Sequence, residues 1–308
     1  MEQNSYDVII VGAGAAGLTA ALYTSRARLT TLVLESSVVG GLTATAYLVE
    51  NYPGFPEGVL GPDLMENMRR QAERFGASLE VAAAQAIQPL DQGFEIISSA
   101  GSRFSRAVII ATGSYHRKLG IPGEREFVGR GVSYCAACDG AFFRDKLVTV
   151  VGGGNSAIDE ALFLTRFAKR VRIVHRRDEL RADKMLQEAA FKNEKIEFIW
   201  DTVLTAIEGK GKVERVRLKN IKTGEERYLE TDGIFIYVGL VPNTGFVADL
   251  IRRDPLGLII VDEALQTSVE GIFAGGDVRA GAVRQTVAAC GDGCVAAHSV
   301  IRYLKQNP

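Results

Sequence analysis

Two stretches of the chain combine short apolar runs and a helical pattern in the same order. In the first, Val8 to Val11 form a continuous apolar run, which is typical of a strand buried on both faces of a sheet. A glycine-rich turn, a helical pattern through Arg26 and a second apolar run, Thr31 to Leu34, follow it. The pattern therefore predicts a strand, a tight turn, a helix and a second strand over residues 6–35.

The turn of this first unit reads Gly12-Ala13-Gly14-Ala15-Ala16-Gly17. Its first glycine permits the turn, its second lets a pyrophosphate approach the backbone, and its third lets the helix pack on the strand. Unpaired N–H groups at the helix start can bind the pyrophosphate. Glu35, directly after the second strand, can accept hydrogen bonds from the ribose hydroxyls of an adenosine. This spacing favours a dinucleotide site over a tight turn that binds nothing.

A second unit with the same order lies further along the chain. Leu147 to Val151 predict a strand, a helical pattern extends to about Phe167, and Val171 to Val174 predict the next strand. His175 follows the first glycine of its turn at the same distance as the acid in the first unit. One chain is thus predicted to carry two dinucleotide sites, with alanine at the third glycine position of the second turn, Gly152-Gly153-Gly154-Asn155-Ser156-Ala157.

The two units differ in the residues that follow their second strands. The first ends in a carboxylate, which suits a free ribose 2′-hydroxyl. The second ends in the basic segment His175-Arg176-Arg177-Asp178-Glu179-Leu180-Arg181. Because arginine can bind a 2′-phosphate bidentately, we expect this site to prefer NADPH over NADH. The alternative is a solvated basic face balanced by nearby acids.

A closely spaced cysteine pair lies between the two units, in Tyr134-Cys135-Ala136-Ala137-Cys138-Asp139-Gly140. Two sulfurs at this spacing can form a small disulfide ring or share a metal. A structural zinc would need two more ligands, and the remaining cysteines, Cys290 and Cys294, are predicted to lie in another domain. With a flavin and a nicotinamide as sources of electrons, the pair is predicted to be redox-active.

The surroundings of the cysteine pair favour redox chemistry, and the remaining cysteines are read differently. A helix that starts near the pair would lower the pKa of a thiol. Asp139 could carry a proton to the departing thiolate, or it could be a helix N-cap, and the two roles are compatible. Cys290 and Cys294 share one face of a later helix among small residues, so we expect both to pack in the core. No role is assigned to His116 or His298.

Two further segments are predicted to be strand ends at the mouth of a nucleotide site. In the sequence, one precedes the second unit and the other follows it. One is the apolar run Ala107 to Ile110 followed by Ala111-Thr112-Gly113, and the other is Gly271 to Val278, which contains Gly276 and Asp277. Arg284-Gln285-Thr286 precede a helix over Val287 to Tyr303, whose N-terminus could face an anionic reduced flavin. The simplest architecture is α/β, with two Rossmann-like domains, the second inserted into the first.

The predicted domain limits follow from this arrangement. Residues 1–115 and 244–308 form the FAD-binding domain, and residues 116–243 form the NADPH-binding domain with the cysteine pair. The loop around Pro242 and Asn243 is the return linker. The length of 308 residues is consistent with two domains.

Composition excludes several classes of protein. Apolar residues make up 47% and charged residues 24% of the chain, and the net charge is −1, so no broad basic field is available for nucleic acid or a membrane surface. The segment Met1 to Ser5 has no basic leader pattern, and the apolar runs are too short to span a bilayer. We expect a cytoplasmic protein, in which a close cysteine pair is catalytic or metal-binding.

Taken together, these motifs closely resemble the low-molecular-weight, bacterial-type thioredoxin reductases. Besides both glycine turns, the cysteine motif and the basic segment, the matching motifs are Glu50-Asn51-Tyr52-Pro53-Gly54, Ala111-Thr112-Gly113, Gly276-Asp277 and Arg284-Gln285. They span nearly the whole chain in the family's order. The resemblance implies a homodimer with tightly but non-covalently bound FAD, and thioredoxin or a similar small dithiol protein as the partner.

The resemblance also implies roles for single residues. Cys138 meets the flavin, Cys135 attacks the partner disulfide, and Asp139 is the acid/base. FAD contacts are implied for Asn51, Asp277, Arg284 and Gln285, with Gly40, Gly41, Gly113 and Thr286 beside them, and the NADPH 2′-phosphate for Arg176, Arg177 and Arg181. A large rotation of the inserted domain is implied as well, in which one orientation brings the cysteines to the flavin and the other brings the nicotinamide there. Because Pro242 fixes one φ angle and limits its neighbour, we expect the hinges near residues 115–117 and 242–244.

A few positions depart from the family's usual pattern. Leu42 follows Gly40-Gly41 where glutamine is common, so a polar contact near the flavin is expected to be missing. Asn155 stands where the second loop often has aspartate, Gly275 replaces a common alanine, and Cys290 is unusual in its stretch. These differences leave the class unchanged and the physiological partner open.

Three alternatives to a thioredoxin reductase are weighed. The first is a reductase for a peroxiredoxin system or another small dithiol protein. The second is a flavoprotein of the ferredoxin–NADP⁺ type, which needs no dithiol and is therefore disfavoured by the cysteine pair. The third is a nucleotide-sensing binding protein without turnover.

Overall fold

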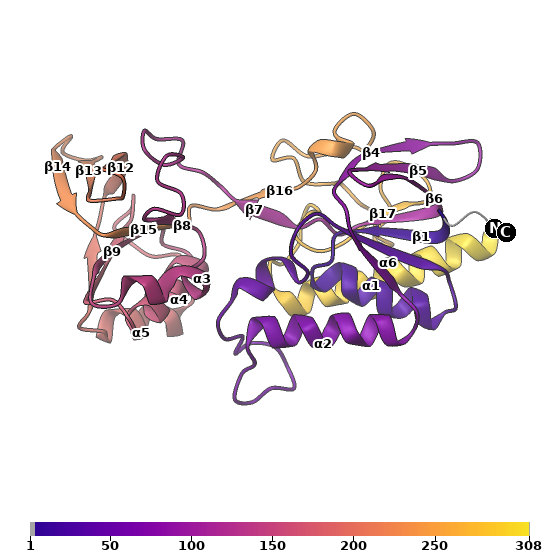
Figure 1. Ribbon diagram of the computed structural model, residues 1–308, viewed down its shortest axis with the longest axis horizontal. Helices are drawn as coiled ribbons and strands as arrows, with labels where there is room; N and C mark the ends of the chain where they lie inside the picture. The colour runs from indigo at the N-terminus through magenta and orange to yellow at the C-terminus, as the bar shows by residue number, and fades with distance from the viewer. Residues whose placement is uncertain (1–3, 308) are drawn as a thin grey trace. The chain divides into compact units, whose positions relative to one another are not determined.

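The computed structural model describes residues 4–307. The segment Met1 to Ser5, from which no leader was predicted, therefore lies partly outside the described residues. The chain divides into two compact units (Figure 1). Unit 1 comprises residues 1–115 and 241–308, and unit 2 comprises residues 116–240. The second unit is therefore an insertion into the first. The return boundary predicted from the sequence, between residues 243 and 244, lies slightly beyond this division.

Unit 1 is built around a seven-stranded sheet, counted within the described residues, with the order β3-β2-β1-β6-β5-β4 and with β17 paired to β6. The strands β1, β2, β3, β6 and β17 are parallel, and β4 and β5 form an antiparallel extension. The strands are β1 Ser5–Val11, β2 Thr31–Glu35, β3 Ser78–Val81, β4 Ala84–Pro89, β5 Phe94–Ser98, β6 Gly101–Ile110 and β17 Ile272–Ala274.

Three helices cover one face of this sheet, as Figure 1 shows: α1 Ala15–Arg26, α2 Gly61–Arg74 and α6 Thr286–Gln306. Val8 and Ile10 of β1 pack against them, and Ile9 and Val11 pack on the opposite face. The apolar run of β1 is continuous because both faces of the strand are buried. Short 3₁₀ turns lie at Gly41–Thr45 and Gly245–Val247.

Unit 2 contains a five-stranded parallel sheet, counted within the same residues, with the order β11-β10-β9-β15-β8. A separate antiparallel sheet, β12-β13-β14, covers one of its faces, and helices cover the other. The strands are β8 Val132–Ser133, β9 Leu147–Val151, β10 Arg170–Val174, β11 Ile196–Ile199, β12 Thr202–Glu208, β13 Arg215–Asn220, β14 Glu226–Glu230 and β15 Gly233–Ile236. The helices are α3 Ala136–Asp139, α4 Asn155–Leu164 and α5 Lys184–Lys192, with a 3₁₀ turn at Gly140–Phe143.

The helix after the second glycine turn is shorter than predicted. It was expected to reach about Phe167, but α4 ends at Leu164. The hydroxyl of Thr165 donates to the carbonyl of Leu162 at 2.6 Å, and Lys195 Nζ donates to the carbonyl of Thr165 at 2.8 Å. Side-chain partners thus satisfy carbonyls at the helix end, in a sequence without a proline or glycine that would mark the stop.

The chain passes between the two units twice, and the passing segments pair with each other. They are β7 Ser114–His116 and β16 Leu240–Pro242, which form a two-stranded sheet. The predicted hinge positions lie in or beside these strands. The rotation itself stays a prediction. Within the described residues, none of the helices has the length and apolar character needed to cross a bilayer.

Candidate active site

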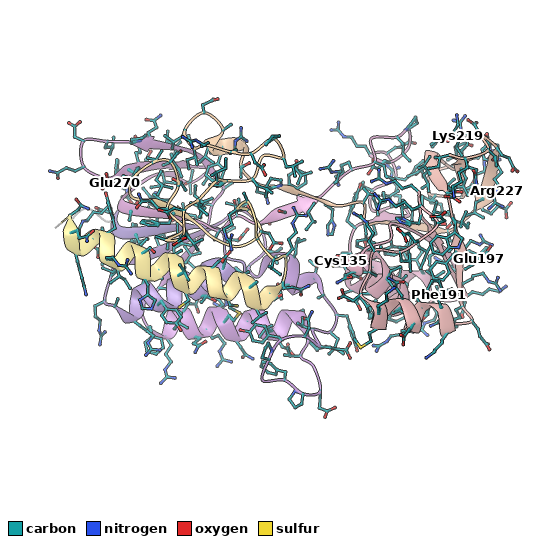
Figure 2. The ribbon with its side chains drawn as sticks, turned by 180° about the vertical axis from the view of Figure 1, so that it is seen from behind. Cys135, Phe191, Glu197, Lys219, Arg227 and Glu270 are labelled. Atoms are coloured by element: carbon teal, nitrogen blue, oxygen red, sulfur yellow. A yellow bond between two sulfur atoms is a disulfide. The ribbon has the colours of Figure 1, made fainter. Side chains whose placement is uncertain are left out.

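Cys135 and Cys138 form a disulfide with an S–S distance of 2.06 Å (Figure 2). The one-turn helix α3 begins directly after Cys135, which occupies its N-cap position. The backbone N–H of Cys138 donates to Cys135 Sγ at 3.1 Å. Cys135 is half-buried and Cys138 is exposed. The predicted helix start at the pair is thus present, and it directs a backbone N–H at the sulfur of Cys135.

Asp139 ends α3 and takes the N-cap position of the following 3₁₀ turn, Gly140–Phe143. Its carboxylate makes no capping hydrogen bond to that turn, so the N-cap alternative is not realised through the side chain. The carboxylate lies next in sequence to Cys138 and is half-buried. Its predicted role in proton transfer stays a proposal.

The three glycines of the first turn occupy different environments. Gly12 has a φ of +106°, and a Cβ there would overlap the carbonyl of Ala111 at the end of β6. A Cβ on Gly17 would overlap the carbonyl of Gly12, so α1 packs directly against the turn. A Cβ on Gly14 would meet no atom within 4 Å. Open space at the second glycine and close packing at the other two are what a bound pyrophosphate requires.

Glu35 ties the end of β2 to this turn. Its Oε2 accepts a hydrogen bond from Ala13 N at 2.8 Å, and its Oε1 accepts one from Ser37 N at 3.1 Å. The side chain also lines a cavity of about 260 Å³ at the carboxyl ends of the strands. Such a cavity, at the point where the strand order reverses beside β1, is the usual place for an adenosine in this architecture. It is lined by Val11, Gly12, Leu34, Glu35, Ser36, Ala82, Ala84, Thr112, Asn243, Gly245 and Phe246.

Sequence reasoning missed Asn243 as part of this cavity. Its Nδ2 donates to the carbonyl of Thr112 at 2.9 Å, and its own carbonyl accepts from the Thr112 hydroxyl at 2.7 Å. The contact joins two segments that are 131 residues apart in the chain. No local pattern could have identified it, because neither residue belongs to a motif that refers to the other.

The other predicted flavin contacts gather around the start of α6. Asn51 Nδ2 donates to Gln285 Oε1 at 3.0 Å, which joins two of these predicted residues directly. Gly40 N donates to the carbonyl of Ala13 at 2.8 Å, so the Gly40-Gly41 turn lies against the first glycine turn. The hydroxyl of Thr286 lies 3.0 Å from that of Thr43, which belongs to the 3₁₀ turn Gly41–Thr45.

Asp277 is a candidate ligand for flavin hydroxyls. Burial raises the pKa of its carboxyl, while the nearby Arg284 lowers it. The adjoining turn is held by Asp292, whose Oδ2 accepts from Gly276 N at 2.9 Å and from Arg279 Nε at 2.7 Å. Arg279 and Asp292 were not singled out in the sequence, yet they fix the backbone that carries Asp277.

The second glycine turn repeats the geometry of the first. Gly152 has a φ of +148°, and a Cβ there would overlap the carbonyl of Tyr237. A Cβ on Gly154 would again meet nothing within 4 Å. A Cβ on Gly153 would overlap the ring of His175, so the ring packs directly on the turn. The second turn therefore leaves the same open space for a pyrophosphate.

Asn155 fixes the segment that follows the arginines. Its Nδ2 donates to Asp183 Oδ2 at 2.7 Å, and its Oδ1 accepts from Asp183 N at 2.8 Å. Arg181 N donates to the carbonyl of Gly153 at 2.7 Å. The basic segment is thus held against the turn by its backbone, which leaves its side chains available.

Arg176, Arg177 and Arg181 are exposed. Among the described residues, their side chains have no hydrogen bond or ion pair with the protein. The nearby acid Asp178 instead pairs with Lys222 at 2.8 Å. The alternative of a basic face balanced by its own acids therefore loses its main support. Three arginines without protein partners are suited to an anion.

His175 is buried at the end of β10, and its Nε2 has no hydrogen-bond partner among the described residues. Burial lowers its pKa, and the charges of Arg181, Arg177 and Arg176 lower it further. The ring lies 6.4 Å from that of Trp200, edge to face. His175 is therefore a neutral group enclosed by cations, whose protonation an added phosphate would favour.

Cys290 and Cys294 are both half-buried. Cys290 packs against the hydrophobic core of unit 1, as predicted for it. The hydroxyl of Tyr52 donates to Cys290 Sγ at 3.6 Å. Cys290 therefore lies at the edge of the core, where it also meets a tyrosine hydroxyl.

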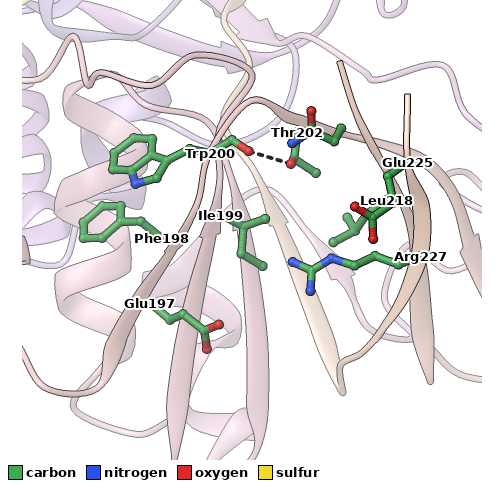
Figure 3. A pocket seen from close by; sticks show the side chains of 9 residues that line it. Glu197, Phe198, Ile199, Trp200, Thr202, Leu218, Glu225 and Arg227 are labelled. Carbon is green, nitrogen blue, oxygen red and sulfur yellow. Dashed lines mark hydrogen bonds between the residues drawn. The ribbon is translucent and has the colours of Figure 1, made fainter. Parts of the chain in front are cut away.

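A second cavity, of about 330 Å³, lies beside β11 in unit 2 (Figure 3). Figure 3 shows Phe198 and Trp200 side by side at its edge, and their rings stack at 4.9 Å. None of the predicted site residues lines it. No ligand is assigned to it.

The residues present fit the two expected cofactors. In unit 1, the open space at Gly14, the cavity beside Glu35 and the carboxylate of Asp277 suit the pyrophosphate, adenosine and hydroxyls of FAD. In unit 2, the open space at Gly154 and the three exposed arginines suit NADPH. Within the described part of the chain, no cluster of His, Cys, Asp and Glu could hold a metal ion.

Comparison with known proteins defines the class. Residues 6–293 match the family model described as pyridine nucleotide-disulphide oxidoreductase. The chain is 50% identical over 302 residues to the thioredoxin reductase of Treponema pallidum (strain Nichols), covering 98% of both chains. It is 49% identical to the thioredoxin reductase of Bacillus subtilis (strain 168), covering 99% of this chain and 96% of the relative.

A solved structure agrees. The crystal structure of Lactococcus lactis thioredoxin reductase matches with a TM-score of 0.95 and 47% identity, covering 98% of this chain and 99% of that one. The chain therefore belongs to the pyridine nucleotide-disulphide oxidoreductases and, within them, to the low-molecular-weight bacterial thioredoxin reductases. The predicted family and fold class are confirmed.

Proposed function

We propose that the chain reduces the disulfide of thioredoxin with electrons from NADPH, using bound FAD and the Cys135–Cys138 disulfide. The observation that carries the proposal is the disulfide at the start of α3, in the same unit as a nucleotide turn flanked by three arginines that have no partner among residues 4–307. When bound, NADPH and FAD supply the electron pair that reduces this disulfide.

The residues of unit 1 bind and orient the flavin cofactor. The turn from Gly12 to Gly17 and the start of α1 hold the pyrophosphate with backbone N–H groups, and Glu35 accepts from the adenosine ribose. Asn51, Asp277, Arg284 and Gln285 hold the flavin half. In unit 2, the turn from Gly152 to Ala157 holds the second pyrophosphate, and the arginines hold the 2′-phosphate.

Disulfide exchange is carried out by the cysteines themselves. The Cys135 thiolate attacks one sulfur of the partner disulfide, and the other partner sulfur leaves as a thiolate that takes a proton. The Cys138 thiolate then attacks Cys135 in the mixed disulfide, which releases the second partner thiol and restores the Cys135–Cys138 bond. The N–H of Cys138, 3.1 Å from Cys135 Sγ, stabilises the attacking thiolate, and Asp139 supplies the proton.

The partner, the assembly and the location complete the proposal. The partner is thioredoxin, the protein that names the relatives, and the chain acts as a cytoplasmic homodimer. A different small dithiol protein as the partner would be reduced by the same thiol–disulfide exchange. The ferredoxin–NADP⁺ alternative has no use for the disulfide, and a nucleotide sensor would show no turnover.

One experiment separates these functions. The purified yellow protein is titrated anaerobically with NADPH, and candidate disulfide proteins are then added one at a time. Rapid reoxidation of the flavin by thioredoxin, with stoichiometric formation of its dithiol, is the expected result. Reoxidation only by a one-electron protein acceptor, or only by a peroxiredoxin-type partner, would overturn the assignment of thioredoxin.

A further inference from the structure

The backbone on both sides of Cys135 is tied to a tyrosine side chain. Tyr134 directly precedes Cys135, and its hydroxyl donates to Glu124 Oε1 at 2.7 Å. On the other side, Ala136 N donates to the hydroxyl of Tyr237 at 3.1 Å. Both tyrosines belong to unit 2, and Tyr237 is buried. The two sequence neighbours of Cys135 are therefore both attached to other parts of unit 2.

Glu124 anchors the first of these tyrosines. The residue is only 4% exposed, and its carboxylate accepts two hydrogen bonds besides that of the Tyr134 hydroxyl. They come from Leu119 N at 2.9 Å and from Gly120 N at 2.6 Å. A buried carboxylate with three donors is held in one orientation, because any other orientation would leave its charge without partners. Tyr134 is thus bonded to a fixed acceptor rather than to a mobile surface group.

The imidazole of His116, the last residue of β7, contacts the rings of both tyrosines. Its centroid lies 6.2 Å from that of Tyr134 with the planes 24° apart, and 5.7 Å from that of Tyr237 with the planes 78° apart. Stacked and edge-to-face rings at these distances are favourable aromatic pairs. Lys118 Nζ lies 3.5 Å from the centroid of the Tyr134 ring. The imidazole therefore joins the tyrosine on one side of the reactive cysteine to the tyrosine on the other.

The backbone ladder of the sheet does not extend to the cysteine. Pairing of β8 with β15 ends at Ser133, where Ser133 lies opposite Phe235. From Tyr134 onward the chain has left the sheet, so the position of Cys135 relative to the rest of unit 2 depends on side-chain contacts. The contacts of Tyr134 and Ala136 described above are of this kind.

We propose that His116 is a positioning residue of the redox disulfide, which holds Tyr134 and Tyr237 so that Cys135 keeps one orientation in the oxidised and the reduced protein. A dithiol whose sulfurs are already placed for ring closure loses little conformational freedom when the disulfide forms. The effective concentration of one thiol near the other is then high, which stabilises the disulfide relative to the dithiol. His116 acts on this equilibrium through the two tyrosines.

The inference rests on the proposed redox role of the cysteine pair, and its test needs neither NADPH nor thioredoxin. The holoenzyme is equilibrated anaerobically in glutathione buffers of graded ratio, in which protein disulfide plus two glutathione thiols give protein dithiol plus glutathione disulfide. After acid quenching and alkylation, peptide mass spectrometry measures the oxidised fraction of Cys135–Cys138. The Tm of each protein is recorded alongside. Failure of thioredoxin turnover would leave this equilibrium measurable, so the two failures are distinguishable.

His116→Ala removes the ring and is expected to shift the equilibrium toward the dithiol by about three- to ten-fold. His116→Phe keeps an aromatic ring and should restore the wild-type value, because the contacts with the tyrosines depend on the ring. Tyr228→Ala, which removes an exposed ring on β14 of the same unit, is the control and should keep the wild-type value. An unchanged equilibrium in His116→Ala, even with a lowered Tm, would overturn the proposal, and so would a failure of His116→Phe to restore it.

A second pair of variants tests the anchor of Tyr134 and keeps every ring in place. Tyr134→Phe removes the hydroxyl that is bonded to Glu124, and Tyr228→Phe removes an exposed hydroxyl of the same kind. Because the bond to a carboxylate is strong, its loss should free Tyr134 and shift the equilibrium toward the dithiol by about three-fold or more. Tyr228→Phe should leave the equilibrium unchanged. Equal values in the two variants would show that the hold on Tyr134 does not reach Cys135, which contradicts the proposal.

Discussion

The carboxylate of Glu35 accepts a hydrogen bond from the backbone N–H of Ala13 at 2.8 Å. This contact links the acid at the end of β2 to the glycine turn at the end of β1. The acid therefore has two roles, because it fixes the turn and also lines the cavity proposed for the adenosine. The binding of the flavin cofactor should depend on it more strongly than a single ribose contact would suggest.

The first prediction concerns Glu35→Gln. The substitution keeps the length of the side chain but removes the charge that strengthens its hydrogen bonds. Loss of one charge-assisted bond costs about 1.5–3 kcal/mol, which corresponds to roughly 10- to 100-fold weaker FAD binding. The ratio of flavin to protein absorbance after gel filtration in dilute solution measures the effect. Glu263→Gln, at an exposed position in the same unit, is the control. Equal flavin retention in both variants would show that Glu35 does not hold the cofactor.

The second prediction concerns the choice of nicotinamide. Replacing Arg176 and Arg177 by Ala removes two exposed cations, and each lost bond to the 2′-phosphate costs about 1.5–3 kcal/mol. The KM for NADPH should rise steeply, while the KM for NADH should stay nearly constant. Arg227→Ala, on β14, is the matched control and should change neither value. Equal losses with both nucleotides would mean that these arginines do not recognise the phosphate.

The third prediction concerns the protonation of His175. Its pKa lies below the ordinary value of 6.5, because burial and the three nearby arginines disfavour the imidazolium. A 2′-phosphate bound by those arginines adds negative charge, so the pKa should rise when NADP⁺ binds. NMR titration of ring-labelled histidine follows this directly. NAD⁺ should have little effect, and His116 should not respond to either nucleotide. A His175 titration that ignores NADP⁺ would place the phosphate elsewhere.

The same shift has a consequence for stability. The folded protein binds a proton at His175 less readily than the unfolded chain does. The contribution of His175 to the free energy of unfolding is therefore fully present above pH 6.5 and decreases as the pH falls below that value. Bound NADP⁺ should reduce this loss, because it raises the pKa of the folded state.

The parts of the site that depend on local backbone geometry could be predicted from the sequence. The conformation of Gly12 and the close packing of Gly17 are required by the turn itself, and their spacing is visible in the chain. The disulfide likewise follows from the spacing of Cys135 and Cys138. Such features need only a few consecutive residues to specify them.

The parts that depend on distant contacts could not be predicted. The bonds between Asn243 and Thr112, and between Ala136 and Tyr237, join residues more than 100 positions apart. The end of α4 at Leu164 depends on Lys195, which belongs to a later segment. The contact of Cys290 with the hydroxyl of Tyr52 joins residues 238 positions apart. In each case the pattern of the local sequence is compatible with more than one outcome.

The central claim is that electrons pass through the Cys135–Cys138 disulfide, and Cys138→Ser tests it most directly. The residues that hold both cofactors are unchanged, so the purified variant should be yellow and its flavin should bleach on anaerobic addition of NADPH. Reduction of thioredoxin, followed by the appearance of its free thiols, should be abolished. Turnover of thioredoxin by this variant at a rate near that of the wild-type protein would contradict the account.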